Sequence, residues 1–558
     1  GAQLGQTQEA YVTRKGLDTG WDEAQLAEHL QELMRGHRRT MRATLRGHDG
    51  RKRAEALSRC NHSLRYDGKR AHRMLMAQGE SKPLECVTTD SGALLTEPAE
   101  CLEEVRRYFA TVSKRRVVDT EALPPWGQGG LDPIIYGGTK DPYWRAPAPL
   151  AASYNRAVFD ACINAMPGKK APGVDGVFNE VLRYMPDEFR DALHSLFQHL
   201  WAVQKTPSKW KVALTVLLYK KGDPSRVSNH RPIGLLCAVQ KLWTATITAV
   251  MTEYADTRRI LSAAQEGFRP HRNTARQLQR LLMAMEDAKL AGSDIYLLYV
   301  DFVNAFGSVD HERLLYTLKL QGFPEDCLGI IRDLYADAKV VVRTPMGDTE
   351  PVLNGGRGTV QGDTLSPLLF ILAIDPLLAW LEAGKRGYRF GTCDESLGPL
   401  GYADDLALVT STHGDLQIQA DKVQAYCEWA QMEVNVGPEK TVYQAMLRRG
   451  GSPPLGVDAI RVGSQVIART GHHVPYPYLG IRAPLTLRFT AHVKTLVSKV
   501  KDRARAIAAI RCNPGLALRV LEMVVRPAVR YSMPFGVLAT ADVRTLNAVF
   551  LSAAKGVC

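Results

Sequence analysis

Two kinds of hydrophobic pattern alternate through the central part of the chain. Short apolar runs typical of buried strands stand at 213–219, 295–300 and 406–409. Longer runs typical of helices stand at 367–384 and 415–431. Because strand-like and helical runs alternate, the pattern predicts a mixed α/β or α+β organisation.

A different pattern begins after residue 488, where apolar residues recur with helical spacing. They are Val493, Leu496, Val497, Val500, Ala504 and Ile507. The intervening basic residues are Lys494, Lys499, Lys501, Arg503 and Arg505. This spacing predicts an amphipathic helix with one apolar and one basic face.

Length and charge narrow the class of protein. A chain of 558 residues is long enough for about three to five domains, and 45% hydrophobic with 23% charged residues excludes wholesale disorder. Lys and Arg exceed Asp and Glu by 71 to 58, a net charge of +13 that favours a polyanionic partner.

Segment 35–76 alone holds 13 basic and 3 acidic residues. We interpret it as a phosphate-binding arm; a solvated basic helix is the alternative.

Other features argue against a membrane span, a signal peptide, a disulfide framework and a zinc site. The longest apolar stretch, 368–381, is interrupted by Asp375 and Pro376 and is too short for a membrane span. The N-terminus lacks the pattern of a signal peptide. The ten cysteines form no C-x-x-C pair, so neither a disulfide framework nor a zinc site is predicted, and we expect a reducing compartment. Segment 119–150 is rich in Pro and Gly and is expected to be a linker or irregular surface segment.

Carboxylates mark the candidate chemistry. Asp404 and Asp405 lie between a short apolar approach and a strand-like run, at the expected tip of a hairpin. Asp301 ends another apolar strand. An acidic turn would explain the first pair alone. Carboxylates from two strands with a shared backbone carbonyl are what a two-metal phosphoryl-transfer site needs, and oxygen ligands of this kind suit Mg²⁺.

The order of several short motifs then points to a family. The chain resembles the reverse transcriptases of non-LTR (LINE-type) retrotransposons, which are related to those of group II introns. The blocks that carry the resemblance stand in the family's order: KKAPGVDG, LLYKKGDPSRVSNHRPIGLLCAVQK, QEGFRPHRNT, DFVNAFGSVDH, VQGDTLSPLLF, YADD, NVGPEKT and YLGI. The resemblance covers about 169–480, and a softer similarity extends over 87–112.

The resemblance implies a catalytic centre. Asp301 and Asp404 would be the principal ligands of two Mg²⁺ ions, for which Mn²⁺ could substitute. Asp405 would be the neighbouring carboxylate, and Phe302 would supply its backbone carbonyl. Lys440 matches the lysine proposed to protonate the leaving pyrophosphate, and a surface lysine is the alternative.

The resemblance also implies a nucleotide site. Lys220 and Arg231 match residues that clamp the incoming triphosphate, and Lys221 is a near-equal candidate because the register is uncertain by one residue. Phe306 occupies the position of a steric gate that excludes a ribose 2′-OH, with core packing as the alternative. Two further residues are expected to line the nascent base pair, where a glycine would permit close approach of the nucleotide: Gln361 and Gly362.

Contacts with template and primer follow in the same way. The block at 265–269 is expected to contact the template backbone through Gln265 and Arg269. The residues that resemble the primer grip are Tyr478, Leu479 and Gly480. Lys494 and Lys501 lie on the basic face expected to follow the hybrid.

We therefore expect an α+β right-hand polymerase with fingers, a palm built on an antiparallel sheet, and a helical thumb. The expected divisions are a mostly helical, basic N-terminal extension with linker at 1–150, fingers at 151–285 with an extra block at 169–185, a palm at 286–485 and a thumb at 486–558. Segments 35–76 and 486–558 carry charges of +10 and +9, which leaves −6 elsewhere. The duplex is expected to be gripped by these two segments.

The expected activity is RNA-directed DNA synthesis on retrotransposon RNA by target-primed reverse transcription. Partners would be an RNA template, a DNA primer, their hybrid and dNTPs, with no membrane, and the location intracellular and nuclear. Alternatives are a group II intron-type or domesticated cellular enzyme, and a catalytically dead RNA-binding scaffold. No apurinic-type endonuclease precedes the motifs and no Cys/His knuckle follows, so we expect a piece of a larger protein or a polymerase without its own nuclease.

Overall fold

A computed structural model describes most of the chain after residue 82. The described residues are 83–116, 122–127, 148–391, 393–437, 439–448, 459–467, 469–508, 514–535 and 538–557. They fall into two compact units, one formed within 79–494 together with 532–538, the other by 495–531 and 539–558. The basic segment 35–76 and the cysteine and histidine residues near it lie outside the described residues.

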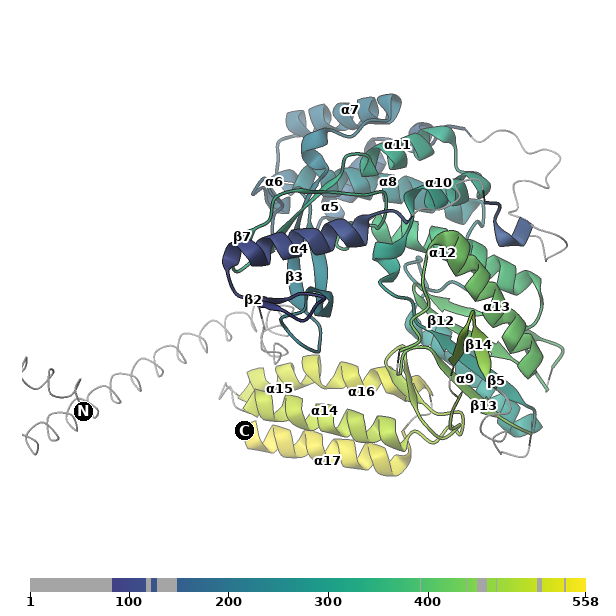
Figure 1. The fold of residues 1–558 in the computed structure, drawn as a ribbon. Coiled ribbons are helices and arrows are strands. Elements are labelled where there is room, and N and C mark those ends of the chain that lie inside the picture. Colours follow the sequence, from purple (N-terminus) through teal and green to yellow (C-terminus); the bar gives the residue numbers. More distant parts are fainter. Residues whose placement is uncertain are drawn as a thin grey trace, which may run out of the picture. The chain divides into compact units, whose positions relative to one another are not determined.

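The first sheet of the larger unit has β5 at its centre (Figure 1). β5 pairs antiparallel with β12 and with β13, and β13 carries β16 parallel at the edge. The strands, in spatial order, are β11 (Leu400–Tyr402), β12 (Asp405–Thr410), β5 (Ile295–Val300), β13 (Val442–Met446) and β16 (Arg469–Thr470). All six residues of β5 are buried, which explains its unbroken apolar sequence. Two of the strands expected from the sequence, 295–300 and 406–409, are therefore confirmed.

The second sheet contains the third expected strand, β3. β3 pairs antiparallel with β4 and parallel with β6. Its members are β4 (His230–Leu235), β3 (Val212–Tyr219), β6 (Lys339–Thr344), β7 (Gly347–Asp348) and β8 (Val352–Leu353). This sheet joins a strand of the expected fingers range to a strand of the expected palm range, so the sequence boundary at 285/286 runs through it. The fingers and palm divisions stay predictions.

Helices surround the two sheets. They are α4 (Pro98–Ser113), α5 (Arg156–Ala165), α6 (Asn179–Arg183), α7 (Asp187–Val203), α8 (Ala238–Thr257), α9 (Thr274–Ala291), α10 (His311–Leu320), α11 (Glu325–Tyr335), α12 (Ser366–Ala383) and α13 (His413–Ala430). Short strands form separate pairs: β1 (Val87–Thr88) with β2 (Leu94–Leu95), β9 (Tyr388–Arg389) with β10 (Ser396–Leu397), β14 (Ile460–Val462) with β15 (Gln465–Ile467), and β17 (Tyr476–Tyr478) with β18 (Ile481–Ala483). The mixture of helices and strands predicted from the sequence is confirmed.

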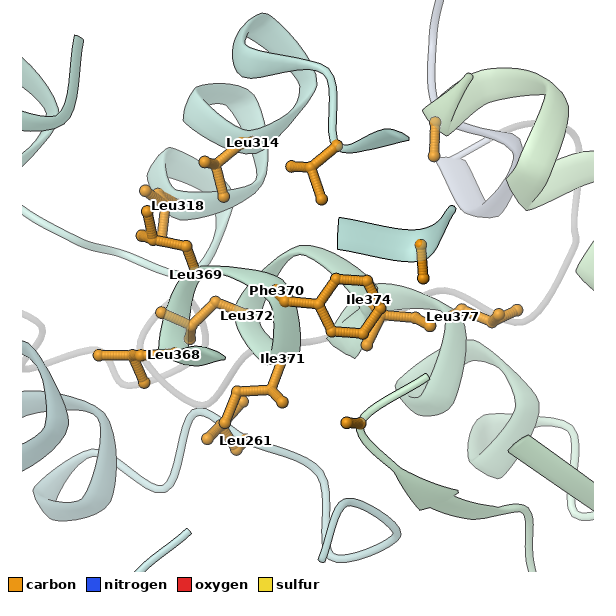
Figure 2. Packing of buried hydrophobic residues seen from close by; sticks show 14 of the residues in the cluster. Leu261, Leu314, Leu318, Leu368, Leu369, Phe370, Ile371, Leu372, Ile374 and Leu377 are labelled. Carbon is orange, nitrogen blue, oxygen red and sulfur yellow. The ribbon is translucent and has the colours of Figure 1, made fainter. Parts of the chain in front are cut away.

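The core of the larger unit is built around α12, which packs against α10 and α13. Figure 2 shows Leu369 of α12 directed toward Leu318 of α10 and Ile371 toward Leu261. Within the part of the chain that the structure describes, α12 is the one helix long and apolar enough to cross a membrane. Because 72% of that stretch is buried and core helices of soluble proteins pass the same test, this is weak evidence for a span.

Trp126 corrects the expectation for segment 119–150. This segment was expected to be a linker or irregular surface, and residues 117–121 and 128–147 lie outside the described residues. Trp126, however, is only 4% exposed and belongs to the main core. Its ring lies 4.8 Å from that of Trp429 and is stacked on Tyr426 at 6.0 Å. This part of the segment is therefore an anchor inside the fold.

The C-terminal region is helical, as expected. Its helices are α14 (Thr490–Ala508), α15 (Pro514–Val524), α16 (Arg526–Ser532) and α17 (Thr540–Val557). Five of the six apolar positions predicted for α14 are buried, and Val497 is half-buried. On the basic face, Arg503 departs from the prediction because its guanidinium donates to the carbonyl of Val524, 2.7 Å away. The other basic positions are exposed.

Candidate active site

Adjacent strands deliver the three carboxylates to one end of the first sheet. Asp301 directly follows β5, and Asp404 lies in the two-residue turn between β11 and β12. The register pairs Tyr402 with Asp405 and Leu406 with Val300, so Asp405 lies one position from the end of β5. Ala403 adopts a φ of 56°, which closes this tight turn. The hairpin tip expected from the sequence is therefore present.

The pKa values of Asp404 and Asp405 are raised, in part by neighbouring carboxylates. Burial, followed by the charges of Asp404 and Asp301, raises the pKa of Asp405 to about 6. Burial and the charge of Asp301 also raise the pKa of Asp404, although Lys220 and Arg231 act in the opposite direction. Negative charge concentrated in this way favours a bound cation.

Asp301 is held by the loop that leads into β13. Asn435 donates its side-chain amide to Asp301 Oδ2 at 2.8 Å and its backbone N–H to the Asp301 carbonyl at 2.7 Å. Lys440 Nζ lies 3.0 Å from the same Oδ2. Asp301 N–H donates to Thr441 Oγ1 at 3.2 Å. Sequence reasoning missed Asn435, although it stands in the NVGPEKT block that contains Lys440.

A cavity of about 640 Å³ opens in front of these carboxylates. Asp301 and Asp404 line it on one side, and Lys220 and Arg231, on the β3–β4 hairpin, also face it. Both cations are exposed. Lys221, the alternative to Lys220, is not among the lining residues. The cavity therefore combines carboxylates and cations, the groups that a metal-bound polyphosphate requires.

Gln361 and Gly362 also line the cavity, and the structure gives a reason for the glycine within the protein itself. Gly362 has a φ of 115°, and a Cβ there would lie 2.5 Å from the Gly234 carbonyl oxygen. Gly234 in turn donates its N–H to the Gln361 carbonyl at 2.6 Å. The close approach to strand β4 is thus sufficient to require a glycine here, and the approach of a nucleotide stays a prediction.

Phe306 packs against the core, which was the alternative left open by the sequence, and its position at the cavity leaves the steric gate a prediction. Its ring stacks on Phe370 of the core at 4.5 Å and meets Phe268 edge-on at 6.2 Å. It also lines the cavity, five residues beyond Asp301. Packing against Phe370 fixes the ring beside the carboxylates, which is what a steric gate would need.

Two of the expected template contacts are corrected. Gln265 is fully buried, and its Oε1 accepts the N–H groups of Gly267 and Ala403, each at 2.8 Å. An enclosed amide cannot touch a passing strand, so Gln265 instead holds the hairpin that carries Asp404. The Arg269 guanidinium donates to three backbone carbonyls, of which the nearest, at 2.8 Å, belongs to Ser262. Its side chain is 11% exposed, so Arg269 stabilises the 261–269 loop.

The expected primer grip is a hairpin turn. Leu479 and Gly480, with φ of 44° and 86°, connect β17 to β18. Gly480 is exposed at the turn, whereas Tyr478 is 3% exposed and its ring lies 5.3 Å from that of Tyr299. On α14, Lys494 and Lys501 are both exposed. Their contacts with nucleic acid stay predictions.

The residues at the hairpin fit a divalent cation by their chemistry. The donors are carboxylates, whose mutual repulsion a cation would relieve. Val303 donates its N–H to the carbonyl of residue 433, and the Asp301 carbonyl accepts the N–H of residue 435. Because successive carbonyls of an extended backbone point to opposite sides, the Phe302 carbonyl points away from the 433–435 loop. Among the described residues, no three His, Cys, Asp or Glu side chains are already gathered as a metal site. The Lys440 ammonium group donates a hydrogen bond to Asp301 Oδ2.

Asn435→Ala should weaken binding of a divalent cation. The variant removes the donor that fixes the Asp301 carboxylate, and loss of such a partner costs roughly 10- to 100-fold in metal affinity. Titration with Mn²⁺ followed by electron paramagnetic resonance measures this affinity without relying on catalysis. Asn179→Ala is the control, because that buried amide bonds only the Pro167 carbonyl among its described contacts. Equal Mn²⁺ affinity in wild type and Asn435→Ala would contradict the assigned role.

Comparisons with known proteins point to one family. Residues 219–483 match the family described as "Reverse transcriptase (RNA-dependent DNA polymerase)". The central part of the chain therefore resembles reverse transcriptases, and it contains Asp301, Asp404 and the cations that face them. The match begins at the last residue of β3 and ends at the last residue of β18.

The relatives reported next come from transposable elements, and two of them are named as RNA-directed DNA polymerases. The "Probable RNA-directed DNA polymerase from transposon BS" of Drosophila melanogaster is 28% identical over 362 residues, 62% of this chain and 37% of that protein. The "RNA-directed DNA polymerase from mobile element jockey" of the same organism is 24% identical, over 69% of this chain and 42% of its own. A "Retrovirus-related Pol polyprotein from type-1 retrotransposable element R2" of Nasonia vitripennis is 24% identical, with coverages of 66% and 34%. The chain therefore spans about two fifths or less of these relatives.

Solved structures show a fainter likeness. An apo telomerase of Candida tropicalis aligns with 67% of this chain and 70% of its own, at 15% identity and a TM-score of 0.34. A likeness of this size adds nothing to the assignment, which rests on the sequence match and the site.

Proposed function

We propose that this chain is an RNA-directed DNA polymerase of a non-LTR retrotransposon that copies element RNA from a primer at the target site. The observation that carries the proposal is one cavity in which Asp301 and Asp404 face Lys220 and Arg231. The reaction forms a bond between the primer 3′-oxygen and the nucleotide α-phosphorus. It breaks the bond between the α-phosphorus and the bridging oxygen, and pyrophosphate leaves.

Asp301 and Asp404 would hold two divalent cations, with Mg²⁺ as the physiological ion and Mn²⁺ as a substitute. When bound, such ions lower the pKa of the attacking hydroxyl and neutralise the phosphates. Asn435 keeps the Asp301 carboxylate oriented, and Gln265 holds the backbone of the turn that carries Asp404. The Phe302 carbonyl points away from the 433–435 loop and is a further candidate ligand.

The surrounding side chains bind the nucleotide. Lys220 and Arg231 pair with its phosphate oxygens, and Phe306 blocks a ribose 2′-OH, which selects dNTPs. Lys440 carries the proton that the departing pyrophosphate requires. It already lies at the carboxylates, paired with Asp301 at 3.0 Å.

The larger parts of the molecule follow the right-hand plan. We assign residues 151–285 to fingers, 286–485 to a palm and the helices from 486 onward to a thumb whose exposed lysines follow an RNA–DNA hybrid. Exposed cations on α14, including Lys494 and Lys501, support this last assignment. We also propose a nuclear location, where a target-site primer would be available. Kinship with group II intron enzymes, or domestication, is compatible with the same site.

Primer extension on an RNA template with Mg²⁺ and dNTPs tests the proposal. We expect extension by the wild type, and little when NTPs replace dNTPs. Wild-type protein that binds primed RNA but does not extend it would instead support an RNA-binding scaffold. Preferential use of NTPs would indicate an RNA-synthesising enzyme and overturn the role given to Phe306.

Lys220→Ala should raise the apparent KM for dNTP by about tenfold, because a charge-assisted contact with phosphate is worth roughly 1.5–3 kcal/mol. Lys221→Ala is the matched control, and we expect less than a twofold change because Lys221 does not line the cavity. Steady-state extension with varied dNTP measures both variants. The reverse ranking would show that the register is displaced by one residue.

A further inference from the structure

Helix α4 contributes to the cavity although it lies more than a hundred residues before the matched domain. Tyr108, Phe109 and Val112 line the cavity together with the catalytic carboxylates. All three side chains are half-buried, and the rings of Tyr108 and Phe109 meet edge-on with centroids 5.5 Å apart. Nothing in the motifs of the polymerase domain assigns a function to this helix.

The helix is firmly attached to the polymerase. It packs on β1 and on β6, β7 and β8, and it also contacts the Ala305–Ser308 turn that contains Phe306. Figure 1 shows α4 crossing from the β7 end of the second sheet toward α10 and α12. The helix therefore contacts both the second sheet and the turn beyond Asp301, and each of these also supplies residues to the cavity lining.

The residues that follow α4 fix its end. Arg115 Nε lies 2.9 Å from Asp310 Oδ2, and Asp310 is 2% exposed and caps α10 through its other oxygen. Arg115 N–H donates to the Gly355 carbonyl at 3.0 Å. A Cβ on Gly355 would lie 2.8 Å from the Lys114 Cα, so the two backbones are in close contact. Because loss of Arg115 would leave the buried Asp310 carboxylate without its cation, the pair helps to fix the position of α4.

The cavity thus has three chemically distinct parts. Lys220 and Arg231 suit phosphates, and Asp301 and Asp404 suit cations. The α4 side chains add an apolar surface, to which Val227 and Pro232 also belong. A volume of about 640 Å³ is within the range of small-molecule sites. A nucleoside triphosphate needs all three surfaces, because its sugar and base are less polar than its phosphates.

We propose that α4 forms a wall of the nucleotide subsite and contacts the sugar or base of the incoming dNTP. This inference rests on the proposed polymerase function and adds to it a specificity surface from outside the matched domain. The wall excludes water from one side of the nucleotide and limits the space available to it.

Two substitutions of Val112 test the wall. Val112→Trp fills space on the cavity side, and Val112→Asp places a charge on the apolar surface with little change in volume. Each should raise the apparent KM for dNTP, and the Kd of a fluorescent dNTP on a dideoxy-terminated primed template, by about tenfold or more. Affinity for the primed template should stay within twofold. Thr111→Trp and Thr111→Asp are matched controls, because Thr111 is exposed on the same turn and does not line the cavity.

The outcomes separate this inference from the function on which it rests. If the wild type does not extend a primer, the polymerase proposal fails first. If it does, and both folded Val112 variants keep nucleotide KM and Kd within twofold of wild type, the α4 wall is wrong and the polymerase stands. A change in template affinity without a change in nucleotide affinity would also overturn the inference, because the wall would then face nucleic acid. Circular dichroism identifies variants that fold, and Val112→Asp replaces Val112→Trp if the larger side chain prevents folding.

Discussion

Asp404→Asn should lower the rate of primer extension by roughly a thousandfold, because a cation site of this kind supplies several kcal/mol and each ~1.4 kcal/mol is a factor of ten. The substitution keeps the size of the side chain but removes the charge that faces Lys220 and Arg231 across the cavity. The hairpin itself should persist, since Gln265 holds the Ala403 N–H at 2.8 Å.

The same variant should be more stable than wild type when no divalent cation is present. Burial and Asp301 raise the pKa of Asp404, which means that the folded protein disfavours its charged form. A neutral amide relieves that cost, so thermal unfolding in EDTA should occur at a higher temperature. Asp405→Asn is the comparison, with a smaller loss of rate expected because Asp405 is not among the cavity-lining residues. An active Asp404→Asn enzyme would remove the basis of the proposed function.

Trp126→Ala should destabilise the larger unit by about 3–5 kcal/mol, the usual cost of replacing a buried tryptophan with alanine. The indole is 4% exposed and contacts three aromatic rings, of Trp380, Tyr426 and Trp429, at centroid distances of 6.3, 6.0 and 4.8 Å. Its removal leaves a void against α12 and α13, the helices that support the first sheet. The loss should therefore extend to the sheet that carries the carboxylates.

Urea unfolding followed by circular dichroism measures this change. Leu123→Ala is the control, because Leu123 is 65% exposed and its truncation should alter the free energy of unfolding by less than about 0.5 kcal/mol. Similar unfolding midpoints for Trp126→Ala and Leu123→Ala would show that segment 122–127 is only loosely attached.

The sequence predicted the elements whose patterns are local. β5 is apolar at every position because both of its faces are buried, and α14 repeats its apolar residues with the period of a helix. The tip at Asp404 follows from a polar pair between two apolar runs. These features depend on neighbours within a few residues, so a linear pattern contains enough information to identify them.

Contacts across long separations could not be predicted in this way. Asn435 reaches Asp301 over 134 positions, and Arg115 reaches Asp310 over 195. Gln265 illustrates the same limit, because its motif suggested a template contact while its amide is enclosed against Ala403. A motif gives the type and order of residues, whereas the direction of a side chain depends on the packing around it.

By itself, therefore, the sequence determined which candidate groups are present: carboxylates at strand ends, cations that suit phosphates, and an order of motifs that resembles the one in reverse transcriptases. Tertiary structure decided which groups share a cavity. It placed Lys220 rather than Lys221 at the cavity, moved Trp126 from an expected linker into the core, and brought Tyr108 of α4 to the cavity that Asp301 and Asp404 line. The physical reason is that residue type and spacing fix what a segment can do locally. Burial of apolar surface between distant segments then fixes where each segment, and each side chain that it carries, lies in the fold.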